Sequence, residues 1–163
     1  MNELEEYRQR MIERLEQAVQ ELRAASQAVR DPLQTAPDGG WNVHQLVAHT
    51  RDVDRDAYGL RLRRTLAEDD PLVTNYDPDN WLATVYKADE PLGKILQELT
   101  ESARQQAELL RSLPAEAWSR PSRHETLGAG FTAQTWVERN LAHMEEHLAT
   151  MREAQQRDAK AAL

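Results

Sequence analysis

The chain has 163 residues, a formal net charge of -8 and no cysteine. This length suits one ordinary domain with a sizeable core, and the lack of cysteine excludes disulfides and thiolate metal sites. The negative net charge and the lack of a cluster of basic residues argue against nucleic-acid binding. Because no apolar run is long enough for a membrane span and the start MNELEEYRQRM is charged, we expect a cytoplasmic protein with no membrane segment.

Apolar residues at alternating spacings of three and four predict a first helix from Asn2 to about Val29. Pro32 ends it, because proline restricts the residue before it and has no N–H to donate. The expected inward stripe consists of Leu4, Met11, Leu15, Ala18, Leu22, Ala25 and Val29.

A compact start signal predicts a second helix that runs to about Leu66. Asn42 is the expected N-cap, Gln45 completes a capping box, and Trp41 packs on Leu46 as a hydrophobic staple. Leu46, Val53, Ala57 and Leu60 form the expected buried stripe.

Two polar residues of the second helix fall on its apolar side. At about 100° per residue, His49 and Asp56 point within about 60° of Val53. We therefore treat both as candidates for a site inside the fold.

Two long connections separate the remaining helices. The irregular stretch from Ala67 to Glu90 is far longer than an antiparallel hairpin requires, so the helices on either side of it are expected to run parallel. The third helix begins near Pro91 and ends before Pro114. A second connection continues to Phe131.

Thr132 is the expected cap of a fourth helix that fades after Ala154 into a charged tail, 155–163. Phe131 and Trp136 repeat the staple geometry. The sequence shows no strand signal and no internal repeat. We therefore predict an all-α fold, a single four-helix-bundle domain spanning 1–163 with its core at about 3–154.

His143 and His147 lie four residues apart on the fourth helix, so both imidazoles share one face. They lie at the border of the apolar stripe, and His49 is inward on another helix. Three inward histidines would each need buried hydrogen-bond partners, whereas bundle cores often build metal sites from facing helices. Three neutral imidazoles with open positions are typical of a catalytic metal site.

The other histidines and nearby acids fit such a site less well. His44 is expected on the surface, and His124 in a glycine-flanked loop is expected to be solvated rather than to line a pocket. A carboxylate di-metal reading of Glu145 and Glu146 lacks inward glutamates on other helices. The H-E-x-x-H order of metalloproteases is also absent.

The segments GWNVHQLVAHTRDVDRDAY, YDPDNW and RHETLGAGFTAQTWVERNLAHMEEHLATM resemble the DinB/YfiT-like superfamily of bacterial four-helix bundles. The resemblance extends from about Leu4 to Met151. Its diagnostic histidines correspond here to His49, His143 and His147. It implies an up-down-down-up bundle, one divalent ion (zinc or nickel, with manganese or iron as alternatives) and a homodimer.

Characterised relatives implied by this resemblance include transferases and isomerases that use low-molecular-weight thiols such as bacillithiol, and many others are called metal-dependent hydrolases. The first hypothesis is therefore an enzyme that activates a thiol or water for attack on a small-molecule substrate. Asp56 is the candidate catalytic base, with Asp52 a weaker one. Arg63 and Arg64 are candidate partners for a thiol's carboxylates, although such positions usually face solvent.

Two other hypotheses stay open at this point. One is a stress-associated bundle that binds metal and dimerises without catalysis. The other is a degenerate family member whose histidines hold no metal.

Overall fold

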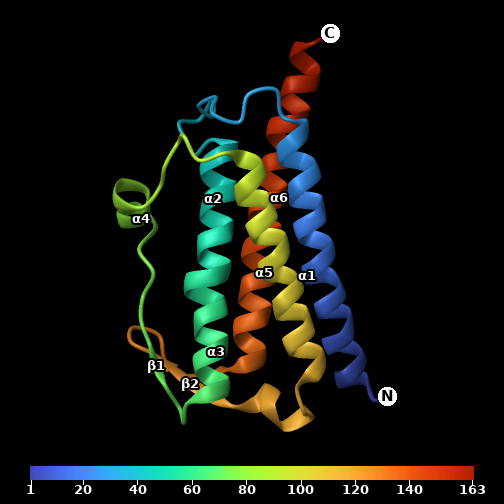
Figure 1. Ribbon diagram of the computed structural model, residues 1–163, viewed down its shortest axis with the longest axis vertical. Coiled ribbons are helices and arrows are strands. Elements are labelled where there is room, and N and C mark those ends of the chain that lie inside the picture. The colour runs from blue at the N-terminus through green and yellow to red at the C-terminus, as the bar shows by residue number, and fades with distance from the viewer.

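The computed structural model describes residues 1–163 and has four long helical segments that pack side by side (Figure 1). The first is α1 (Glu3–Ala28) and the second joins α2 (Val43–Val53), the π-helical segment η1 (Asp54–Tyr58) and α3 (Gly59–Ala67). The third is α5 (Leu92–Ser112) and the fourth is α6 (Ala133–Ala161). The predicted four-helix bundle is confirmed.

Contacts between side chains give the helix directions. Tyr7 bonds Glu138 near the starts of α1 and α6, and Arg152 bonds Glu21 further along both, so these helices run parallel. Arg51 of α2 bonds Glu98, and Asp54 of η1, which follows α2, bonds Gln106 further along α5. The second and third long helical segments therefore also run parallel. Figure 1 shows α1 and α6 running in one direction and α2–α3 and α5 in the other.

The predicted helix starts are present. Asn42 accepts a hydrogen bond from the N–H of Gln45, whose side chain in turn accepts the N–H of Asn42, which completes the capping box. Thr132 caps α6 through the N–H of Thr135. These local bonds fix where each helix begins, as the sequence indicated.

A small sheet at one end of the bundle makes the all-α prediction incomplete. Strands β1 (Leu72–Val73) and β2 (Pro121–His124) pair in parallel, and β3 (Gly128–Thr132) pairs antiparallel with β2. The strands are too short to show an alternating pattern, and β1 finds its partner about fifty residues away. Their pairing ties the two long connections to each other.

The first long connection also contains α4 (Pro78–Thr84), and the second begins with the 3-10 segment η2 (Ala115–Ser119). Asp77 caps α4 through the N–H groups of Asp79 and Asn80. Trp81 of this short helix is buried against the bundle. The first long connection is therefore packed against the bundle rather than being a free loop.

Three expectations about burial and helix length are wrong. Leu4 and Leu60 are 48% and 44% exposed, although the helix periodicity predicts both to face inward. Leu60 turns outward because the π-helical segment η1 inserts an extra residue into the turn before it, which shifts the helix phase. The last helix continues to Ala161 instead of fading after Ala154, since nothing in its charged tail stops a helix.

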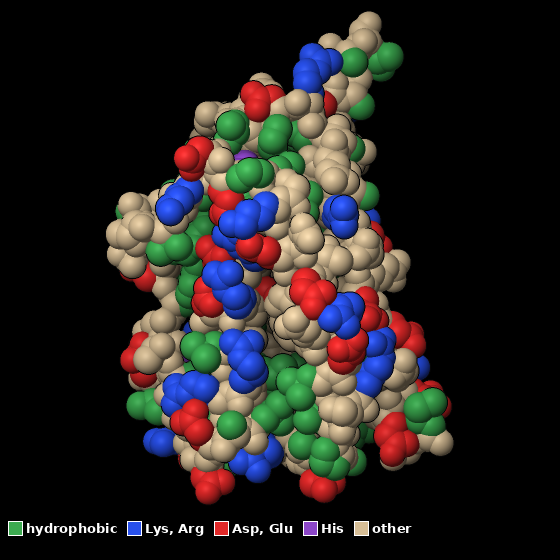
Figure 2. All heavy atoms as spheres, viewed as in Figure 1, with side chains coloured by type: hydrophobic (Ala, Val, Ile, Leu, Met, Phe, Trp, Pro, Cys, Tyr) green, Lys and Arg blue, Asp and Glu red, His purple; other side chains and the backbone are tan.

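The core forms two adjacent clusters, one around Leu15, Leu22 and Leu99, and one around Leu62, Trp118 and Trp136. Outside, acidic and basic side chains alternate on the face in Figure 2, so no large patch of one sign forms there. No helix combines the length and apolar character needed to cross a membrane.

Candidate metal centre

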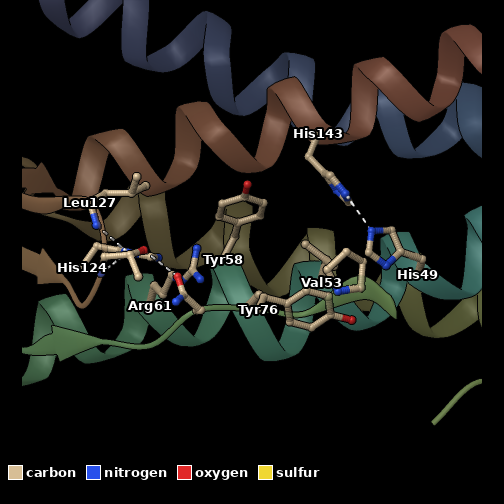
Figure 3. A pocket seen from close by; sticks show the side chains of 12 residues that line it. His49, Val53, Tyr58, Arg61, Tyr76, His124, Leu127 and His143 are labelled. Atoms are coloured by element: carbon tan, nitrogen blue, oxygen red, sulfur yellow. Dashed lines mark hydrogen bonds between the residues drawn. The ribbon is translucent and has the colours of Figure 1, made fainter. Parts of the chain in front are cut away.

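Three histidines from two helices converge in the bundle. The Nε2 atom of His143 in α6 lies 3.1 Å from Nε2 of His49 in α2 and 2.9 Å from Nε2 of His147. One ring nitrogen from each residue lies within 4.8 Å of the others. Figure 3 shows the rings of His49 and His143 pointing toward each other. The structure thus brings together the three histidines selected from the sequence.

Helix geometry and packing explain this arrangement. His143 and His147 are one turn apart on α6, and the buried Met144 and Leu148 beside them fix the face that turns inward. His49 lies on α2, which packs against α6 and buries nearly every side chain. The packing of the core around each histidine therefore fixes the direction in which its imidazole points.

Burial keeps the three imidazoles neutral. It lowers the pKa of His49 to about 4, with a further contribution from His147. It lowers the pKa of His143 to about 3, assisted by both neighbouring histidines, and it also lowers the pKa of His147. At neutral pH all three rings carry a free lone pair, which is the form that binds a metal.

Hydrogen bonds alone do not satisfy the ring nitrogens of the three clustered histidines. A neutral imidazole Nε2 makes one bond, as donor or acceptor, yet Nε2 of His143 meets two other nitrogens. The Nδ1 atoms of His49 and His143 are buried without a partner. With the hydrogens on Nδ1, the three Nε2 lone pairs face one another, an arrangement that a shared cation stabilises. Nitrogen ligands of one zinc ion lie about 3.3 Å apart, since each Zn–N bond is about 2 Å.

Aromatic side chains hold His49 in place. Trp41 and Trp81 meet its ring edge-on at centroid distances of 4.8 and 5.1 Å, and Tyr76 lies at 5.8 Å. Trp81 in turn donates its indole N–H to the buried carboxylate of Asp52 at 2.8 Å. The carboxylate of Asp52, the weaker candidate base, thus accepts from Trp81 as well as from Arg51 and Arg55.

The structure separates Asp56 from the histidine cluster. Its side chain is exposed and accepts hydrogen bonds from Arg55. The π-helical segment turns Asp56 outward and brings Asp54 into the core instead, so the expected inward position of Asp56 is wrong. Arg63 is exposed as well, and Arg64 pairs with Glu68.

Asp54 is the buried acid that sequence reasoning missed. Its carboxylate accepts bonds from Gln106 at 2.6 Å, from Asn140 at 2.7 Å and from the hydroxyl of Ser102. Burial raises the pKa of Asp54, while these donors oppose the shift. The network joins η1, α5 and α6 one turn from His143. Gly59, five residues after Asp54, was the available signal in the sequence, because a Cβ there would lie 2.2 Å from the Asp54 carbonyl oxygen.

The two remaining histidines are also placed differently from the expectation. His44 is buried, where its Nδ1 accepts from the Tyr86 hydroxyl and its Nε2 donates to the Glu90 carbonyl. His124 is buried in β2 and lines a cavity instead of facing solvent. Both residues acquire partners from the long connections, whose paths the sequence did not reveal.

A cavity of about 330 Å³ opens beside the histidine cluster. His49 and His143 lie at one end of it, and Arg61 and His124 lie at the other (Figure 3). Tyr58 and Tyr76 line the space between them. A small molecule in this cavity would lie against His49 and His143, two of the three clustered histidines.

The profile of the DinB superfamily matches residues 3–151 of the chain. Over 157 residues the chain is 29% identical to a Bacillus subtilis protein named "Putative metal-dependent hydrolase YfiT", covering 93% of this chain and 86% of that protein. A Halalkalibacterium halodurans protein of the same description is 28% identical over 120 residues, covering 74% and 68%.

A solved structure supports the fold. It is described as "YfiT from Bacillus subtilis is a probable metal-dependent hydrolase with an unusual four-helix bundle topology". It matches with a TM-score of 0.86 at 24% identity, covering 96% of this chain and 89% of that one. The two chains share the bundle architecture.

Proposed function

The chain belongs to the DinB superfamily, and from this premise we propose that it is a divalent-metal-dependent enzyme whose ion is held by His49, His143 and His147. The observation that carries the proposal is the pair of short contacts at Nε2 of His143, which hydrogen bonds alone do not satisfy. Zinc or nickel suits three imidazoles best, with manganese or iron as alternatives.

The chain's own residues position the reaction. A bound divalent cation supplies Lewis-acid chemistry that lowers the pKa of a nucleophile, either water or a low-molecular-weight thiol. The three histidines would hold that cation beside the cavity, and Trp81 and Trp41 contact the ring of His49 and keep it oriented. Tyr58 and Tyr76 line the cavity between the histidines and Arg61, where they would contact a bound substrate.

The nucleophile is proposed to come from outside the chain. The protein has no cysteine, and no aspartate or glutamate lines the cavity. A hydrolase that activates water agrees with the names of the relatives. A transferase that activates a thiol of the bacillithiol kind needs the same histidines, so the two reactions are separated by assay.

Metal content tests the site. We expect protein loaded with zinc or nickel to retain the ion after desalting and His147→Ala to lose most of it. His44→Gln is the matched control, because it removes a buried histidine that lies outside the cluster. Equal metal in wild type and His147→Ala would refute the proposed centre.

Turnover tests the enzyme. Metal-loaded protein is mixed with bacillithiol and monochlorobimane, and separately with nitrophenyl esters and phosphates. Conjugation or hydrolysis above the chelated control identifies the nucleophile. Retained metal without any turnover would favour the alternative, a non-catalytic, stress-associated bundle. The homodimer, the cytoplasmic location and the lack of nucleic-acid binding stay predictions.

A further inference from the structure

The end of the cavity opposite the histidine cluster carries an arginine without a carboxylate partner. The Arg61 guanidinium lies 5.5 Å from the centroid of the Tyr58 ring and 5.1 Å from that of Trp136. Nη2 donates to the Thr74 carbonyl at 2.7 Å, and Arg61 forms no ion pair with any Asp or Glu. Of five N–H donors, the protein uses one.

His124 supplies a second donor beside Arg61. Its Nδ1 accepts the backbone N–H groups of Thr126 and Leu127, each at 3.2 Å. Backbone amides only donate, so the imidazole hydrogen must lie on Nε2. That Nε2–H has no acceptor within the protein, and the ring lines the cavity.

Arg61, the only Lys, Arg, Asp or Glu in the lining of the cavity, is opposite in sign to the net charge of the whole protein. The chain has 28 acidic residues, yet none of them lines this cavity. Glu125, the acid that most affects Arg61, accepts the backbone N–H of Asn75 instead of pairing with the guanidinium. Burial lowers the pKa of Arg61, and Arg139 lowers it further. A partly buried cation without a partner favours an anionic ligand.

We propose that Arg61 and His124 form an anion subsite that binds the carboxylate or phosphate group of a small substrate. Its reacting end then lies at the other end of the cavity, near His49 and His143. The placement of the reacting end rests on the proposed function, whereas the binding of an anion by Arg61 and His124 does not. Arg61 provides charge and a fork of donors, and His124 provides one directed hydrogen bond.

A purely structural role for Arg61 explains less. Packing on Tyr58 and Trp136 and one bond to Thr74 would hold the segment after β1 against α3. It does not account for the Nε2–H of His124, which has no acceptor in the protein although the residue lines the same cavity, or for the absence of acids from the lining. The subsite explains all three observations.

The test is calorimetric titration of zinc-loaded protein with benzoate, phenyl phosphate and neutral benzamide. Both anions should bind, and Arg61→Gln should weaken them about tenfold or more, since one charge-assisted interaction is lost. Arg61→Lys should recover part of the affinity. Arg63→Gln is the matched control, because it removes an exposed guanidinium two residues away. The tighter of the two anions identifies carboxylate or phosphate as the natural group.

Two results would overturn the subsite: benzamide binding as tightly as benzoate, or Arg61→Gln binding the anions like wild type. If Arg61→Gln does not fold, nuclear magnetic resonance of the wild-type His124 ring decides. Its Nε2–H signal should shift with benzoate and not with benzamide, and an unmoved signal would refute the proposal.

Metal content is measured on the same samples. Anion binding that persists after chelation and depends on Arg61 supports the subsite even if no metal is found, in which case only the proposed enzyme fails. Anion affinity that follows zinc content and ignores Arg61 would reject the subsite while leaving the metal centre intact.

Discussion

Trp81 of the short helix α4 donates its indole N–H to the buried Asp52 at 2.8 Å and presses its ring edge against His49. A residue in the long connection thereby fixes the orientation of a histidine in the bundle. Partners of this kind affect a metal site without touching the ion.

We expect Trp81→Phe to weaken zinc binding about tenfold. The ring contact with His49 would remain, but without the bond to Asp52 the aromatic side chain would no longer be held in one orientation. Competition with a fluorescent chelator measures the affinity. Trp118→Phe alters another buried indole away from the cluster and should bind zinc like wild type, so an equal loss in both variants would argue against a positioning role.

Metal removal should lower the melting temperature. The three histidines converge only in the folded chain, so an ion at about a hundred times its dissociation constant adds about 2.7 kcal/mol. For a domain of this size the shift is about 5 to 10 °C. Differential scanning calorimetry with and without chelator measures it. His147→Ala should show no shift, and a wild-type curve indifferent to chelator would exclude tight binding.

The metal-free protein should lose stability as pH falls below 6.5. An unfolded histidine takes up a proton near that pH, whereas the folded chain holds the pKa of His49 at about 4 and that of His143 at about 3. Between about pH 6.5 and pH 4 the unfolded state therefore binds more protons than the folded state, so lowering the pH favours unfolding. Urea unfolding at several pH values measures the slope, which should be smaller for His49→Gln. Equal slopes would mean that His49 has the same pKa in the folded and the unfolded chain, which would contradict its burial as a neutral ring.

Gly59→Ala should destabilise the chain by about 1 to 3 kcal/mol. Its Cβ would lie 2.2 Å from the Asp54 carbonyl, so the π-helical segment would have to rearrange. Gly93→Ala in α5 is the control, because nothing lies within 4 Å of a Cβ there and alanine favours a helix. Urea unfolding compares them, and a Gly59→Ala variant as stable as Gly93→Ala would show that the segment accepts a regular helix.

Local signals in the sequence predicted much of the fold. Asn42 with Gln45 and Thr132 with Thr135 form caps from residues three apart, so their geometry depends little on the rest of the chain. The inward positions of His143 and His147 follow from the period of one helix. The pairing of β1 with β2 could not be predicted, because each strand is short and its partner is far along the chain.

The sequence by itself determined the helices, the bundle and the three candidate ligands, because helix periodicity is local and repeated over many turns. Only the tertiary structure decided which acid is buried. One extra residue in the π-helical turn exchanges Asp56 for Asp54 and leaves Leu60 exposed. It also decided that Arg61 and His124 lie beside each other at one end of the cavity, since they approach each other only after the two long connections pack together.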